Sequence, residues 1–181
     1  MTNGMILFSA LLVPSLSVDL QPMPSGFTLR DPDLFRVEKA AGDELAHDIY
    51  SITLDARGRV LVSGPGYIRV LHDRDGDGRF EAASDFWRGP ASGCQGMVFH
   101  EASLYTTGGA GLERYDDHDG DGTADGPPVL LLPLAGGEHG AHALRVGPDG
   151  FLYFLGGNHC GLPRGRVRGF SPVADFYAGV F

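Results

Sequence analysis

Cysteine is scarce in this chain, with only Cys94 and Cys160 among 181 residues. Two cysteines cannot build a disulfide framework, and the sequence contains neither a CxxC pair nor the CxxCH segment that attaches haem. One disulfide would be compatible with export, but a sequence cannot show whether two thiols lie close together. The state of both cysteines is therefore open at this point.

Long helical periods and positive charge are also lacking. No stretch repeats its apolar residues with the spacing of a helix, whereas 28 glycines and 12 prolines suit short strands joined by tight turns. We therefore predict an all-β protein. The formal charge of −9 and the pI of about 5.1 disfavour a nucleic-acid partner or an anionic membrane surface.

The amino terminus has an apolar run without a basic segment before it. Met5 to Val18 is apolar, and residues 15–17 offer a small-x-small cleavage site, so we predict a signal peptide over residues 1–17. A buried strand is the alternative. The run is too short to span a bilayer, which takes roughly 20 residues, and the remaining chain offers no transmembrane candidate. We expect an exported protein, periplasmic or at the cell surface, with a linker at 18–26 and one domain at 27–181.

Three segments share one plan, an apolar run, a tight turn and a second β-rich run. They are "ITLDARGRVLVS", "MVFHEASLYTTG" and "LRVGPDGFLYFLG", and aligning them on Val60, Leu104 and Leu152 gives spacings of 44 and 48. The first two continue into a third strand, at Tyr67–Leu71 and Gly111–Tyr115. Repeats of this length with four short strands are typical of β-propeller blades. We predict a partial propeller with three visible blades, truncated at the carboxyl end, with a β-sandwich as the alternative.

Each of the first two units leads into an acidic loop, "DRDGDGRFE" and "DHDGDGTAD". Both follow D-x-D-x-D-G-x-x-[DE], and alternate carboxylates around one centre supply the oxygen shell that Ca²⁺ prefers. The predicted ligands are Asp73, Asp75, Asp77, the carbonyl of Arg79 and Glu81 in the first loop, and Asp117, Asp119, Asp121, the carbonyl of Thr123 and Asp125 in the second. A solvated Asp/Gly turn is the alternative for a single copy, and the matched pair favours calcium in a structural role.

The loops differ from EF-hands. Position 12, where an EF-hand has a bidentate glutamate, is occupied by Ser84 and Pro128, and the flanking segments are predicted strands. We therefore expect hairpin calcium loops, of the kind seen in integrin-type propeller blades.

Residues 136–160 contain a second group of polar side chains, which are Glu138, His139, His142, Asn158 and His159. They flank predicted strands at Leu144–Val146 and Phe151–Leu155, and an antiparallel hairpin would bring both flanks to one end. Neutral imidazole is the usual general base near pH 7. Zinc binding is a second option that no spacing here fixes, and histidines that only satisfy loop backbones are a third.

The segments "GGEHGAHALRVGPDGFLYFLGGNH", "LDARGRVLVSGPGYIRVLHDRDGDGRF" and "LERYDDHDGDGTADG" are familiar. Over roughly residues 26–165 the chain resembles the N-terminal propeller of exported planctomycete-type proteins described as membrane-bound dehydrogenase-like, which often carry a haem-binding cytochrome c domain. That propeller is similar to the six-bladed soluble glucose/sorbosone dehydrogenases, which use pyrroloquinoline quinone (PQQ).

The resemblance implies roles for a few residues. A histidine ten positions before the Asp of GPD removes the substrate hydroxyl proton in the soluble enzymes while hydride passes to the quinone, and this position is His139 here. Glu138 or His142 would orient it. Gln95 is loosely similar to a glutamine of the quinone pocket, and Asn158 and His159 are assigned to cofactor binding beside it. The basic residues that hold the quinone there lie in later blades, and no haem motif is present.

Three functions remain open. The first is an exported quinoprotein-type dehydrogenase acting on a sugar or other alcohol, with further blades and a cytochrome c domain downstream. The second is a non-catalytic, calcium-stabilised propeller that binds glycans or a protein partner. The third is a metal-dependent hydrolase or lactonase on the same fold. Fold alone does not decide among them.

Overall fold

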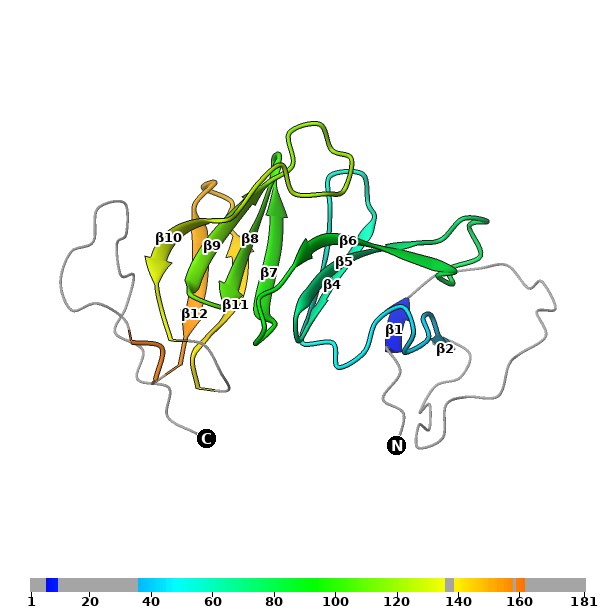
Figure 1. The fold of residues 1–181 in the computed structure, drawn as a ribbon, viewed down its shortest axis with the longest axis horizontal. Helices are drawn as coiled ribbons and strands as arrows, with labels where there is room; N and C mark the ends of the chain where they lie inside the picture. Colours follow the sequence, from blue (N-terminus) through cyan, green and yellow to red (C-terminus); the bar gives the residue numbers. More distant parts are fainter. Residues whose placement is uncertain (1–5, 10–35, 136–138, 158, 162–181) are drawn as a thin grey trace.

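The computed structural model describes residues 6–9, 36–135, 139–157 and 159–161. Every regular element in this described part is a β-strand, and all pairings are antiparallel (Figure 1). The strands are β1 (Ile6–Ser9), β2 (Arg36–Lys39), β3 (Ser51–Leu54), β4 (Val60–Gly64), β5 (Tyr67–His72), β6 (Ala82–Arg88), β7 (Cys94–His100), β8 (Ser103–Gly108), β9 (Gly111–Asp116), β10 (Val129–Pro133), β11 (Ala141–Val146) and β12 (Leu152–Gly156). The all-β prediction is confirmed for the described residues.

The strands form successive sheets in chain order. A first sheet has the order β3-β4-β5-β6, a second has β7-β8-β9-β10, and β11 and β12 make a hairpin, while β1 pairs only with β2. The aligned residues Val60, Leu104 and Leu152 lie at or next to the start of β4, β8 and β12, the second strand of each unit. The repeat read from the sequence is therefore a structural repeat.

The sheets lie face to face, so the core is layered. One apolar cluster between the first and second sheets contains Leu61, Ile68, Met97 and Leu104, and a second between β7–β10 and the hairpin contains Leu112 and Leu144 among others. Both faces of the second sheet are covered, because Leu104 packs in the first of these clusters and its neighbour Tyr105 packs against the other. The first strands of the units are neighbours, since β3 lies against β7 and β7 against β11.

A third layer lies on the other face of the first sheet. Ala41, Val62 and Tyr67 pack together there, next to β2. The backbone N–H of Phe80 donates to the carbonyl of Ala40, directly after β2, at 2.8 Å. The second sheet repeats this contact one layer on, where the N–H of Ala124 donates to Phe86 in β6 at 3.0 Å. The segment after β2 thus contacts the first sheet as β6 contacts the second.

The two ends of this stack expose apolar side chains. On β3, Ile52 and Leu54 are 45% and 56% exposed, and Ile52 shares a face with its cross-strand partner Val62. On β12, Tyr153 and Leu155 are 41% and 60% exposed, whereas the intervening Phe154 packs inward. Each end therefore presents a half-covered apolar face.

Several details bear on the predictions. Ile6–Ser9, inside the predicted signal peptide, forms β1, while the rest of that peptide and the linker 18–26 lie outside the described residues. The strand expected from Phe151 begins instead at Leu152, because Phe151 closes the preceding turn by accepting a hydrogen bond from the N–H of Gly147. Within the described part of the chain, no helix is long and apolar enough to cross a membrane.

Both cysteines are buried free thiols. Cys94 lies in the cluster between the first two sheets, and Cys160 lies in the cluster beside the hairpin. Because they belong to different layers, no disulfide joins them.

Candidate metal loops and histidine site

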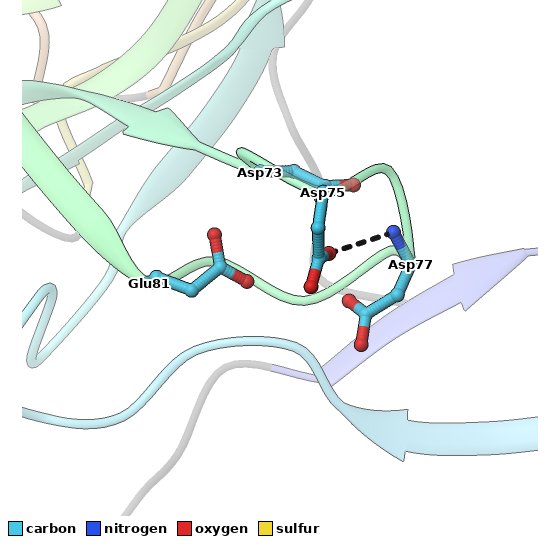
Figure 2. Close-up of side chains that lie close together, drawn as sticks. All are labelled: Asp73, Asp75, Asp77 and Glu81. Carbon is cyan, nitrogen blue, oxygen red and sulfur yellow. Dashed lines mark hydrogen bonds between the residues drawn. The ribbon is translucent and has the colours of Figure 1, made fainter.

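Each acidic loop joins the third strand of a sheet to the fourth. The first follows β5 and precedes β6, and the second follows β9 and precedes β10. In the first loop, one oxygen from each of four carboxylates lies within 4.8 Å of the others, and these residues are Asp73, Asp75, Asp77 and Glu81 (Figure 2). In the second, Asp117, Asp119 and Asp121 converge in the same way. Seven of the eight predicted carboxylate ligands are thus brought together.

Asp125, the eighth, lies outside this converging set. Its carboxylate accepts a hydrogen bond from the backbone N–H of His118 at 2.9 Å. Glu81 makes the equivalent bond with the N–H of Arg74 at 2.9 Å and still belongs to the first cluster. In both loops, the carboxylate at position 9 therefore accepts a hydrogen bond from the N–H at position 2. Only in the first loop does it also converge with the other carboxylates.

The backbone folds around the carboxylates because successive N–H groups donate to them. In the first loop, Gly76 and Gly78 donate to the two oxygens of Asp73 at 2.7 and 2.9 Å, and Arg79 donates to Asp77 at 2.8 Å. Gly78 has a φ of 88°, a conformation that favours glycine, so the turn predicted at position 6 is confirmed. In the second loop, Thr123 donates to Asp121 at 2.7 Å, the same bond as at position 7 of the first.

The surroundings of the two loops differ. All four carboxylate residues of the first loop are exposed, whereas Asp117 is only 2% exposed. One oxygen of Asp117 accepts from the N–H of Gly122 at 3.3 Å, and the other, Oδ1, is buried without a hydrogen-bond partner. Burial, followed by the charges of Asp121 and Asp119, raises the pKa of Asp117 above its ordinary value.

Two arginines from the first sheet contact the second loop. They lie in the turn between β3 and β4, where Arg57 donates to the carbonyl of Asp119 at 3.1 Å and Arg59 to those of Gly120 and Asp121 at 3.0 and 2.8 Å. The buried carboxylate of Asp55 holds this turn. It accepts from the backbone N–H groups of Arg57 and Arg59 at 2.8 Å and from Nε of Arg59 at 2.5 Å.

The histidines lie at the opposite end of the strands from the second loop (Figure 1). His139 precedes β11 and His159 follows β12, and their rings meet edge to face with centroids 5.4 Å apart. The N–H of His159 also donates to the carbonyl of His139 at 2.9 Å. This contact confirms the predicted convergence of these two residues. Both residues are exposed. Because β11 has six residues, the two sites are on the order of 20 Å apart.

The other residues predicted for this site are placed as follows. The carbonyl of His142, in β11, accepts from the hydroxyl of Thr107 and faces Gly96 of β7. Gln95 lies in a bulge of β7 next to Gly96, so it is close to the start of β11. Glu138 and Asn158 lie outside the described residues. The described members of this group are thus near one end of the two neighbouring strands β7 and β11.

A buried polar group between the first two sheets was not predicted from the sequence. Burial raises the pKa of the Cys94 thiol to about 11, and burial also raises the pKa of Glu113. Tyr115 lies in the same layer, and its hydroxyl is 3.4 Å from a carboxylate oxygen of Glu113. Such a thiol stays protonated near neutral pH, so Cys94 acts as a core residue and not as a nucleophile. The alternation of β9, in which Glu113 falls between Leu112 and Arg114, gave no sign of this burial.

Comparison with known families assigns the chain to one family. The family model called Domain of unknown function (DUF7133) matches residues 27–169. The chain belongs to this family. No curated protein matches it significantly, and neither does any solved structure. The match covers both acidic loops and the histidines.

Proposed function

We propose that this DUF7133 chain is part of a calcium-stabilised β-propeller from an exported dehydrogenase of the quinoprotein type that oxidises a sugar or other alcohol. The propeller proposal is supported by sheets that succeed one another in chain order, with their first strands in contact. The coverage of the second sheet on both faces disfavours a sandwich, in which each sheet has one inner face. Further sheets of the same repeat would cover the exposed apolar faces at the two ends.

The observation that carries the calcium part is the buried oxygen of Asp117. A carboxylate oxygen without a partner is costly in a folded protein, and a bound cation would supply the missing partner. Asp119 and Asp121 converge with Asp117, and hard oxygen ligands of this kind suit Ca²⁺. Because the loops lie at the end of the strands opposite the histidines, we assign their ions a structural role. Catalysis would take place at the histidine end.

For the enzymatic part, His139 is the proposed base that removes the hydroxyl proton of the substrate. Its exposed ring lies against that of His159, at the edge of the sheets where strands β7 and β11 begin. His139, His159 and Gln95 carry no permanent cation, so this set alone does not fit an anionic quinone such as PQQ. We therefore assign quinone binding to residues of further sheets.

Dye reduction in the full-length protein, supplied with PQQ and a panel of sugars and alcohols, tests this proposal. Replacing His139 with Ala should lower the rate by about two to four orders of magnitude, the usual contribution of a general base. The matched control is His100→Ala at the other end of β7, which should leave the rate unchanged. Full activity of the His139 variant would refute its role. Wild-type protein that reduces no dye but retains glycans or a protein partner would favour the non-catalytic binding propeller.

A further inference from the structure

The two acidic loops share one sequence pattern but have different neighbours. The first loop is exposed, and its position-8 residue Phe80 contacts the segment after β2. The second lies between the turn at residues 55–59 and β6. Arginines of that turn donate to it, and the N–H of its Ala124 donates to the carbonyl of Phe86 in β6. Four carboxylates converge in the first loop and three in the second, so ligand charge alone would favour the first. The affinity of a calcium loop also depends on its rigidity and surroundings, and these favour the second loop.

Burial is the first difference. Both oxygens of Asp73 accept backbone hydrogen bonds, and the residue is open to water. Asp117 is 2% exposed, and its buried Oδ1 has no hydrogen-bond partner. An ion at the second loop would therefore relieve a cost that does not exist at the first. Screening by water is also weaker around a buried carboxylate, so the attraction to a cation is larger.

Rigidity is the second difference. Arg59 donates hydrogen bonds to the backbone carbonyls of two consecutive residues of the second loop, Gly120 and Asp121. Arg57 donates to the carbonyl of Asp119. The guanidinium of Arg59 is itself fixed by Asp55, whose side chain is 3% exposed. These bonds hold the loop in its converged form before any ion arrives, which lowers the ordering cost of binding.

From these two differences we infer that the second loop is the tighter of two Ca²⁺ sites, and that the turn carrying Asp55, Arg57 and Arg59 makes it so by holding the loop from the neighbouring sheet. This inference rests on the proposed calcium binding. The turn thereby becomes a positioning element for a metal that it does not touch. Binding is also reciprocal, so an ion at the second loop strengthens the attachment between the two sheets.

Calorimetric titration of the metal-free chain with CaCl₂ tests the inference, using a matched pair of substitutions at loop position 3. Asp75 and Asp119 are both exposed and accept equivalent bonds from Asp77 and Asp121, so Asn at either position removes one charge with little risk to folding. We expect two binding phases at least about tenfold apart in affinity in the wild type. D119N should weaken the tight phase, and D75N should weaken the other.

The role of the turn is tested by Arg59→Lys, which keeps the positive charge but loses the planar fork that bonds two carbonyls. We expect the tight phase to weaken by about tenfold or more and the other phase to stay unchanged. Unchanged affinity in the Lys variant would overturn the role of the turn. A tight phase that responds to D75N, or equal affinities in the wild type, would overturn the ranking of the loops. Absence of any calcium heat would instead overturn the proposed function.

Discussion

Asp117→Asn is expected to have opposite effects on stability with and without calcium. Without the ion, the wild type keeps a buried carboxylate whose Oδ1 has no partner, close to the carboxylates of Asp119 and Asp121. The amide of Asn has nearly the same shape, carries no charge and can donate to a neighbouring carboxylate. The metal-free variant should therefore be more stable than the wild type, by about 1 kcal/mol if one buried polar group is satisfied.

With calcium the order reverses. A ligand at 100 times its dissociation constant stabilises the folded state by about 2.7 kcal/mol. In a chain of 181 residues, 1 kcal/mol corresponds to a shift of about 2–4 °C in melting temperature. Saturating calcium should thus raise the melting temperature of the wild type by roughly 5–11 °C. The Asn variant, which lacks a central ligand of the second loop, should gain much less.

The assay is thermal unfolding followed by circular dichroism, in EDTA and in excess CaCl₂, for the wild type, D117N and the exposed control D73N. A melting temperature of D117N below that of the wild type in EDTA, or above it in calcium, would refute the reasoning about the buried oxygen. Identical wild-type curves in EDTA and calcium would refute calcium binding itself.

The pH dependence follows from the raised pKa of Asp117 in the folded, metal-free chain. Burial is the main cause, with the charges of Asp121 and Asp119 next. Because the folded pKa lies above the ordinary value of 3.8, the folded state binds the proton more tightly, and stability is lost as pH rises from that value through the folded pKa. The advantage of D117N in EDTA should therefore be full above this window and vanish below it. An advantage independent of pH would contradict this explanation.

Two further predictions concern the core. Gly96→Ala should destabilise the fold by about 1–3 kcal/mol or more, because the added Cβ would lie 2.0 Å from the carbonyl oxygen of His142, whereas Gly126→Ala, with open space around it, should have little effect on a urea melt. Both thiols, Cys94 and Cys160, should resist a thiol reagent in the native chain and react together once denaturant unfolds it; prompt reaction of either in buffer would show that its layer is open.

The repeat could be predicted from the sequence because local patterns specify it. Alternation around Val60, Leu104 and Leu152 identifies the second strand of each unit, and glycines such as Gly78 mark the turns. The convergence of the loop carboxylates was also predictable, since the backbone N–H groups that donate to these carboxylates lie at most seven positions from them. These features depend on short stretches of chain.

The unequal surroundings of the loops could not be predicted in the same way. Arg59 and Asp121 are 62 positions apart, and nothing in either segment indicates that the turn of one sheet bonds the loop of the next. The burial of Asp117 and the exposure of Asp73 likewise follow from which neighbouring segment covers each loop. The meeting of His139 and His159 was predicted because a single hairpin joins them, whereas the position of Gln95 beside that hairpin depends on the packing of β7 on β11.

The exposed apolar faces at the two ends of the stack are unlike, and this gives the chain a direction. The face with Ile52 and Leu54 corresponds to the side of the second sheet that packs backward onto the first, and the face with Tyr153 and Leu155 to the side that packs forward. Complementary but different faces make head-to-tail contacts, which lead to closed rings or to open fibres and not to two-fold dimers. Self-association of this chain in isolation should therefore be polar, with each copy adding to the end of the last.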